Sequence, residues 1–255
     1  MAGRIAVRIG TWNVEYADRS ATNRRRGQIM RDHPADIWVL TETHDDLHPG
    51  EGFEPVHSAQ RPFYGNRVKE GSRWVSIWSR FPILERVIVT GGDRERTVAA
   101  LIAAPPGPLI VYGTVLPWNG DMGRHGESPG ASGWSEFYRV VPQQIEEWKA
   151  IRARLPEAAL CVAGDFNTDM GTGGYYGTRK GIKMLLEGLA EVSAFCATGP
   201  DRQHNTSLEY PPIDHIALPL AWAGATRIAA AWEGRSGSPR LSDHSGIVVE
   251  TEGVP

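Results

Sequence analysis

The sequence has only two cysteines, Cys161 and Cys196, among its 255 residues. Two cysteines cannot form the disulfide framework of a small secreted domain, so we expect buried free thiols in a reducing compartment, most simply the cytoplasm. The Cys and His residues form no cluster with the spacing of a zinc site. The chain also lacks a phosphate-binding P-loop and the Gly-x-Ser-x-Gly motif of serine hydrolases.

Long hydrophobic runs are missing as well. The longest apolar stretches, such as residues 217–223, are far shorter than the roughly 20 residues that a membrane-spanning helix needs. Residues 1–12 alternate apolar side chains with Arg4 and Arg8, which is typical of a β-strand and not of a signal peptide. We therefore expect no membrane span.

No excess of basic charge is available to coat a polyanion. The net charge is −3 and the isoelectric point is about 6.2, which counts against a protein that binds nucleic acid over its whole surface. Residues 60–80 are a local exception, because they carry Arg61, Arg67, Lys69, Arg73 and Arg80 against one acidic residue, Glu70. Such a run is usually a solvated face, and it can also bind phosphates.

The remaining composition is that of a globular protein. Hydrophobic residues make up 41% and charged residues 22% of the chain, close to the average of folded domains. The length allows one large domain, and no linker or repeat divides it. We expect residues 1–255 to form a single catalytic domain.

Alternating apolar residues and short β-branched runs predict many strands. They fall at residues 5–9, continuing to Thr11-Trp12-Asn13, and at residues 37–41, 74–79, 86–90, 97–103, 109–116, 159–163, 214–218, 226–230 and 246–250. Helices are predicted at residues 23–31, 137–155 and 180–189. Ten or more strands with few helices indicate an α/β protein in which two packed mixed β-sheets are flanked by helices.

Polar residues stand at the ends of several predicted strands. They are Asn13, Glu42, Asp165, Asn167, Asp214, Asp243 and His244. A rigid sheet presents such side chains to a cleft, and carboxylates gathered there commonly hold a hard divalent cation through oxygen ligands. Each residue alone is more typical of a turn or a cap than of a metal site, so the evidence lies in the whole set.

The order of these motifs resembles that of the endonuclease/exonuclease/phosphatase superfamily. The motifs are Thr11-Trp12-Asn13-Val14, Leu40-Thr41-Glu42, Gly164-Asp165-Phe166-Asn167, Ile213-Asp214-His215-Ile216 and Ser242-Asp243-His244. The superfamily includes deoxyribonucleases, abasic-site endonucleases, inositol polyphosphate phosphatases and neutral sphingomyelinases. The resemblance implies a four-layer α/β sandwich with one active site between the sheet edges.

The resemblance also implies a role for each residue of the set. Glu42 resembles the principal Mg²⁺ ligand, assisted by Asn13 and Asp243, and Mn²⁺ is the alternative cofactor. Asp165 is similar to the residue that activates water, and Asn167 to the one that orients the nucleophile or the phosphate. His244 would stabilise the phosphoryl group, with Asp214 holding its ring, since a carboxylate fixes the tautomer of an imidazole and raises its pKa.

One position departs from the family pattern. Val115 stands where relatives carry a His or Tyr that contacts the phosphate. Trp118, Asn119 or His125 in the following loop would have to supply that contact, or else Val115 points into the core and the strand is aligned differently. The basic residues Arg67 and Arg73, with Trp118 and Asn119, are the substrate-binding candidates.

The expected activity is hydrolysis of phosphodiester bonds, with nucleic acid as the first substrate class. A small-molecule, inositol or lipid phosphoester is an alternative, because a fold does not select its substrate. A second alternative is a catalytically impaired binding module, which the Val115 departure would explain. The sequence does not determine the oligomeric state.

Overall fold

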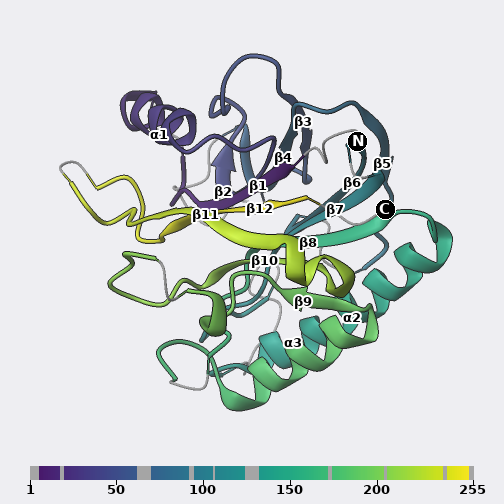
Figure 1. The fold of residues 1–255 in the computed structure, drawn as a ribbon. Helices are drawn as coiled ribbons and strands as arrows, with labels where there is room; N and C mark the ends of the chain where they lie inside the picture. Colours follow the sequence, from purple (N-terminus) through teal and green to yellow (C-terminus); the bar gives the residue numbers. More distant parts are fainter. Residues whose placement is uncertain are drawn as a thin grey trace.

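The computed structural model describes residues 6–17, 20–61, 70–91, 95–105, 107–123, 132–171, 174–203, 206–237 and 240–252. Its strands form two six-stranded sheets that pack face to face (Figure 1). The first sheet has the order β11-β12-β1-β2-β4-β3, and the second has the order β5-β6-β7-β8-β10-β9.

Each sheet is mixed, with one parallel pair near its centre. The first sheet contains β1 (Val7–Asn13), β2 (Ile37–His44), β3 (Glu54–His57), β4 (Ser72–Ser79), β11 (Thr226–Trp232) and β12 (Gly246–Thr251), and only β1 and β2 are parallel among its pairs. The second contains β5 (Ile83–Val87), β6 (Thr97–Ala104), β7 (Gly107–Val115), β8 (Ala159–Asp165), β9 (Ala194–Cys196) and β10 (Asp214–Pro219), with β7 and β8 parallel. The carboxyl ends of the parallel strands place Asn13 and Asp165 at one edge of their sheets.

Three helices complete a four-layer sandwich. Helix α1 (Ser20–Asp32) lies against the first sheet, and α2 (Ser135–Arg154) and α3 (Arg179–Glu191) lie side by side against the second (Figure 1). Two 3₁₀ turns, η3 (Pro200–Arg202) and η4 (Leu220–Ala225), flank β9 and β10. None of the described helices is long and apolar enough to span a membrane.

The hydrophobic core has one layer between the sheets and one under each set of helices. The middle layer joins β-branched residues from both sheets, including Val39, Ile77 and Val111. Trp12, Trp38 and Trp78 pack beneath α1, and Trp148 packs between α2 and the second sheet. These four tryptophans are buried, so their rings form a large part of the core under the helices.

The sequence-based fold is confirmed, with differences at element boundaries. Strand β2 does not stop before Glu42 but continues to His44, and β5 begins three residues earlier than expected. Strands β3 and β9 were not predicted because each is a short edge strand of three or four residues. Both cysteines are free, as expected.

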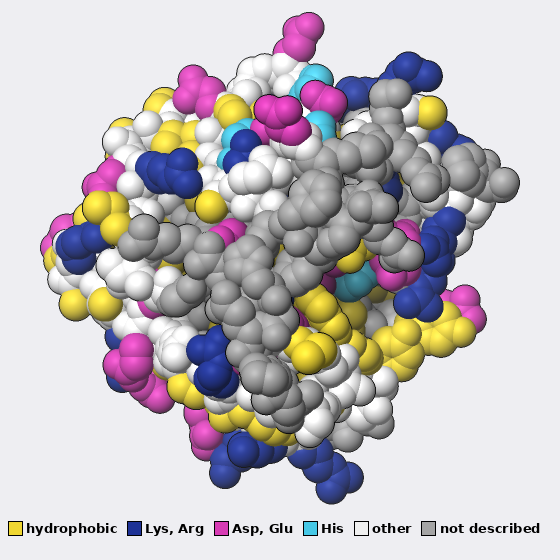
Figure 2. Space-filling view, turned by 180° about the vertical axis from the view of Figure 1, so that it is seen from behind, with side chains coloured by type: hydrophobic (Ala, Val, Ile, Leu, Met, Phe, Trp, Pro, Cys, Tyr) yellow, Lys and Arg dark blue, Asp and Glu magenta, His cyan; other side chains and the backbone are white. Residues whose placement is uncertain are grey.

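The surface carries both signs of charge. On the face shown in Figure 2, described Lys and Arg side chains are scattered among acidic ones.

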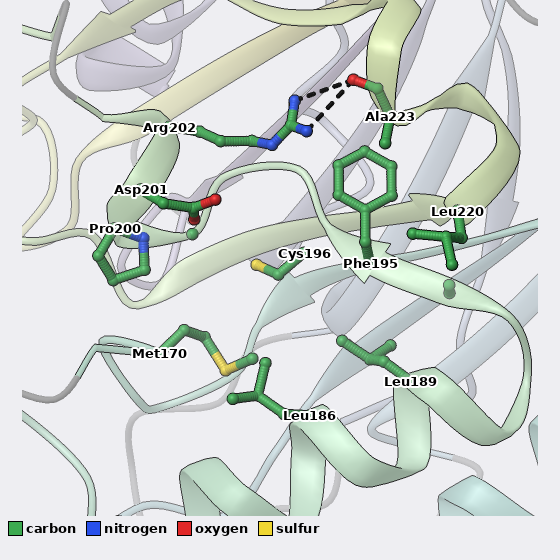
Figure 3. Close-up of a pocket in the computed structure, with 12 residues that line it drawn as sticks. Met170, Leu186, Leu189, Phe195, Cys196, Pro200, Asp201, Arg202, Leu220 and Ala223 are labelled. Carbon is green, nitrogen blue, oxygen red and sulfur yellow. Dashed lines mark hydrogen bonds between the residues drawn. The ribbon is translucent and has the colours of Figure 1, made fainter.

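A cavity of about 430 Å³ lies between α3, β9 and the two 3₁₀ turns, where Met170, Leu186, Phe195 and Arg202 line it (Figure 3). None of the sequence-predicted site residues lines this cavity.

Candidate active site

Asn13 connects the two sheets at the edge where the parallel strands end. It is 1% exposed, and its Nδ2 donates to Oε1 of Glu42 at 3.2 Å and to Oδ2 of Asp165 at 3.0 Å. Its Oδ1 accepts from the backbone N–H of Glu15. A single amide therefore holds one carboxylate from each sheet in a fixed relation.

Glu42 occupies an unusual backbone conformation for a residue inside a strand. Its φ is +49°, a left-handed value that costs a non-glycine residue on the order of 1 kcal/mol or more. Glu15, Tyr16 and Asn167, all in the loops around this carboxylate, also have positive φ. Such strain is common at functional sites, so these residues make this edge of the sheets a candidate site.

The Gly164-Asp165-Phe166-Asn167 turn is built by local constraints. A Cβ on Gly164, whose φ is +133°, would lie 2.0 Å from the carbonyl oxygen of Thr114, so only glycine lets β8 approach β7 here. Phe166 is fully buried under the helices. Asp165 Oδ1 accepts from the Asn167 backbone N–H, and the Asn167 side chain donates to the Leu116 carbonyl at 2.8 Å.

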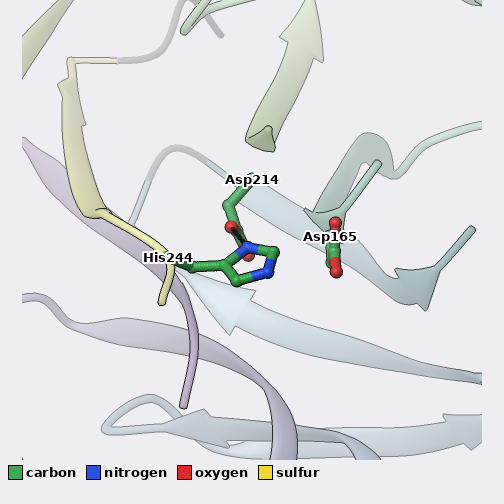
Figure 4. Close-up of side chains that lie close together, drawn as sticks. All are labelled: Asp165, Asp214 and His244. Carbon is green, nitrogen blue, oxygen red and sulfur yellow. Dashed lines mark hydrogen bonds and ion pairs between the residues drawn. The ribbon is translucent and has the colours of Figure 1, made fainter. Parts of the chain in front are cut away.

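Asp214 and His244 form a closely held pair beside Asp165. Nδ1 of His244 lies 2.6 Å from Oδ2 of Asp214, and Asp214 stands opposite Asp165 on the neighbouring strand. Figure 4 shows the imidazole against Asp214, with Asp165 facing it from β8. Donor atoms of the three residues all lie within 4.8 Å of one another.

Burial and charge set the ionisation of this cluster. Burial raises the pKa of Asp165 to about 7, with Asp214 adding to the effect and His244 opposing it. Burial alone would lower the pKa of His244, but the charges of Asp214 and Asp165 outweigh it and raise that pKa to about 10. Near neutral pH the imidazole is therefore a cation, and the neighbouring carboxyl can exchange a proton.

Ser242 ties this pair to the first sheet. Its Oγ donates to the Asn13 carbonyl at 2.6 Å and accepts from the His244 backbone N–H at 3.0 Å. Asp243 is half-exposed, and its Oδ1 lies 3.9 Å from Nε2 of His244. The short Ser242-Asp243-His244 segment thus brings an acidic side chain and a cation to the same edge.

One carboxylate oxygen of Glu42 is available to a ligand. Its Oε2 is buried and has no hydrogen-bond partner in the described part of the chain, a costly state for a carboxylate oxygen unless a ligand completes it. Burial raises the pKa of Glu42, while Arg61 and Asn13 lower it. By contrast, the protonated His244 offers no free lone pair, so the carboxylate oxygens fit a hard cation better than the imidazole does.

The predicted substrate-binding residues have varied surroundings. The Trp118 ring is half-buried against the inter-sheet core, 6.0 Å from the Trp74 ring, and Asn119 is exposed. Arg73 forms two hydrogen bonds to Asp45, at 2.9 and 2.8 Å, which balance its charge within the protein. Arg67 and His125 lie outside the described residues.

Val115 lies in the core between the sheets. It is 1% exposed and belongs to the inter-sheet cluster, and its backbone N–H donates to the Arg96 carbonyl. Of the two alternatives that the sequence left open, the structure therefore favours the one in which Val115 points into the core, because apolar neighbours surround it.

Several contacts in this region were not predicted from the sequence. Arg61 appeared only within a charged run, but it is 5% exposed and lies 3.7 Å from Oε2 of Glu42. Tyr175 and Tyr210 stack with their ring centroids 5.6 Å apart, and they line a groove together with Asp243 and His244. Periodicity and motif order carry no signal for contacts of this kind, because they join separate segments of the chain.

The chain is similar to known proteins, both to one sequence family and to several solved structures. A model of the Endonuclease/Exonuclease/phosphatase family matches residues 10–244. No protein of curated function shows significant sequence similarity to the chain. Solved structures share its fold: a 3'-5' exonuclease, NExo, from Neisseria meningitidis is 18% identical with a TM-score of 0.66, covering 96% of this chain and 99% of that one.

Two further structures share the fold. An AP endonuclease from Archaeoglobus fulgidus is 15% identical, with a TM-score of 0.65 and coverage of 95% of this chain and 98% of its own. The human Nocturnin catalytic domain is 14% identical, with a TM-score of 0.67 and coverage of 96% and 93%. At these identities the likeness establishes the four-layer fold alone.

Proposed function

Because the chain belongs to the endonuclease/exonuclease/phosphatase family, it is a metal-dependent phosphoester hydrolase, and we propose that it cleaves phosphodiester bonds of nucleic acid with Mg²⁺. The observation that carries the proposal is the pair of a buried Asp214 and a half-buried His244 facing Asp165, beside a Glu42 oxygen that lacks a hydrogen-bond partner among the described residues. These groups match what phosphate ester hydrolysis requires: an oriented water, charge neutralisation and help for the leaving oxygen.

Glu42, Asn13 and Asp243 are the residues that would hold the cation. The bound cation would neutralise charge on the non-bridging oxygens and assist the leaving oxygen. Mn²⁺ would serve the same role, since it accepts the same oxygen ligands. The buried, unpartnered Oε2 of Glu42 supports this assignment.

Asp165 would accept the proton of the attacking water. The raised pKa of its carboxyl, about 7, suits a base that works near neutral pH. Asn13 and the Asn167 backbone each donate to one of its oxygens, so the carboxylate is held in one orientation. Asn167 would position the water or the phosphate with the polar atoms of its side chain that the Leu116 carbonyl does not use.

His244 would stabilise the negative charge that develops on the phosphoryl group. Its pKa of about 10 keeps the imidazole charged at neutral pH. Asp214 contacts Nδ1, which leaves Nε2 to contact the phosphoryl group. This arrangement is a preorganised electrostatic contact, which is worth more in a buried site than in water.

Three observations support nucleic acid as the substrate class. The exposed, stacked rings of Tyr175 and Tyr210 border His244 and offer a surface on which bases stack. Arg235 lies over the Tyr210 ring at 5.9 Å and adds positive charge there. One similar structure is described as a 3' phosphatase from Neisseria bound to a product DNA hairpin.

A substrate panel with Mg²⁺ tests the proposal. The panel holds plasmid DNA, an abasic duplex, RNA, bis-nitrophenyl phosphate and nitrophenyl phosphate, each assayed also with excess chelator and with the Asp165→Asn variant. We expect chelator-sensitive cleavage of at least one nucleic acid that exceeds cleavage of either small ester. Preference for a small ester would instead support a small-molecule, inositol or lipid phosphoester, and inactivity on all substrates would support a binding module.

A further inference from the structure

Arg61 lies in an aromatic sandwich beside the proposed cation site. Its guanidinium is 3.5 Å from the centroid of the Trp74 ring and 4.2 Å from that of the Tyr16 ring. Its backbone N–H donates to the Ser72 carbonyl, which holds this segment against β4. Trp74 on β4 lies opposite Glu42 on β2, because Thr41 pairs with Val75 and Thr43 pairs with Arg73. The two rings therefore hold the positively charged guanidinium of Arg61 close to Glu42.

The contact between Arg61 and Glu42 is an incomplete ion pair. Nη1 of Arg61 lies 3.7 Å from Oε2 of Glu42, too far for a hydrogen bond. Oε2 of Glu42 and Nε of Arg61 are both buried without a hydrogen-bond partner in the described residues. Buried charges that keep unused donors and acceptors are costly, and they persist where a ligand completes them in the working state.

A neighbouring arginine shows what a completed pair looks like. Arg96 also lies near Trp74, at 5.1 Å, but both of its terminal nitrogens bind the carboxylate of Asp121. Arg96 is therefore neutralised by its own partner, whereas Arg61 keeps an unused donor at the edge of the site. The aromatic rings hold the Arg61 guanidinium without consuming its N–H groups.

We propose that Arg61 is a phosphate-binding residue of the reaction, paired with Glu42 in the free protein and turned to a non-bridging oxygen of the substrate when a divalent cation takes that carboxylate. The inference rests on the proposed function. A cation held by Glu42 would repel the guanidinium and neutralise the charge that holds it, and a phosphate would restore a partner for the planar guanidinium group. Arg61 thereby supplies the donor that the buried Val115 cannot provide.

The proposal gives opposite expectations for two binding measurements on an Arg61→Met variant. Without Arg61, calorimetry at pH 8 should show Mg²⁺ binding tightened by at least about tenfold, because a competing positive charge beside Glu42 is gone. Binding of inorganic phosphate to the Mg²⁺-loaded protein should weaken by about tenfold or more. Turnover on the preferred substrate should fall roughly a hundredfold, the usual loss for one preorganised donor.

Two variants serve as controls. Arg202→Met also removes a guanidinium that lies over an aromatic ring, 4.6 Å from the centroid of Phe195. It also removes the hydrogen bonds to the Ala223 carbonyl that Figure 3 shows. Arg202 lies away from the proposed site. This substitution should lower stability and leave both affinities unchanged. Arg61→Lys keeps the charge without the planar fork, so Mg²⁺ affinity should stay near wild type while phosphate affinity still falls.

The outcomes separate this inference from the proposed function. A wild-type protein with no Mg²⁺-dependent hydrolysis of any phosphoester would end the proposed function, and with it the role of Arg61. An active wild type whose Arg61→Met variant keeps its phosphate affinity and turnover would overturn the inference alone. Parallel loss of Mg²⁺ and phosphate affinity, or unfolding of both Arg61 variants, would show that the guanidinium only supports the structure, and would also overturn it.

Discussion

Nδ1 of His244 lies 2.6 Å from Oδ2 of Asp214, although 30 positions separate the two residues. Asp214 is fully buried at the first position of β10, and His244 precedes β12 of the other sheet. The pair therefore joins the two sheets at the site. Because Asp214 holds and charges the imidazole, the two side chains should act as a single unit.

Loss of either partner should disable this unit. We expect Asp214→Ala to lower turnover nearly as much as His244→Ala, and the double variant to be little worse than His244→Ala, since groups that act together give strongly non-additive losses. Steady-state kinetics of the three variants measure this. Losses that multiply in the double variant would mean that the residues work independently.

Glu42→Gln should separate the charge of this side chain from its shape. The amide fills the same space but removes the negative charge that most favours a divalent cation, so activity should fall by at least roughly a hundredfold. A Mg²⁺ titration of activity should show a matching loss of affinity. Full wild-type activity in excess chelator would contradict the cation requirement itself.

Asp165→Asn should leave the protein folded and still able to bind Mg²⁺. An amide can replace the carboxylate as a neighbour of Asn13, but it cannot accept the proton of water, so turnover should be nearly abolished. Calorimetry with Mg²⁺ and a melting curve provide the check. If the variant no longer binds Mg²⁺, Asp165 is a metal ligand and the role proposed above is wrong.

Val115→His tests the place of this side chain in the core. An imidazole without a partner between the sheets should destabilise the protein by about 2 kcal/mol, with no gain in activity on bis-nitrophenyl phosphate. Val115→Thr, which keeps the shape and replaces one methyl group with a hydroxyl, should cost less. A Val115→His variant with an unchanged melting temperature and faster turnover would show that this strand end does face the phosphate.

His215 should make the protein sensitive to acid. Burial lowers the pKa of His215 from 6.5 to about 4, where its ring nitrogens lie 2.9 Å from the Thr168 carbonyl and the Thr198 hydroxyl. The unfolded chain takes up this proton at a higher pH than the folded one. The stability is therefore fully present above pH 6.5 and is lost as the pH falls from there toward about 4.

The size of this effect can be measured against a variant. Between pH 7 and pH 5 the wild type should lose about 2 kcal/mol more unfolding free energy than His215→Gln, which keeps a donor and an acceptor but does not titrate. Urea unfolding at the two pH values gives the comparison. Equal losses in the two proteins would mean that His215 is not the group responsible.

Much of the fold was predictable because its signals are local. Alternation along β1 and the apolar run before Glu42 identify strands from neighbouring residues alone, and the three- and four-residue spacing in α2 identifies a helix. The Gly-Asp-Phe-Asn turn is also local, since the close approach of β8 to β7 excludes a side chain at Gly164. The ordered motifs likewise pointed to Asn13, Glu42, Asp165, Asp214 and His244, which the structure brings together.

Only the tertiary structure determines which of these residues contact one another and which charged side chains are neutralised by a partner. Asn13 contacts both Glu42 and Asp165, although Asp165 lies 152 positions further along the chain. The periodicity of a single strand cannot predict such a contact between two sheets. Arg61 and Arg73 had the same appearance in a charged run, but packing of Tyr16 and Trp74 buries one beside Glu42, whereas Asp45 neutralises the other. Burial and pairing depend on partners brought from distant segments, so the ionic state of the site emerges only once the two sheets are packed.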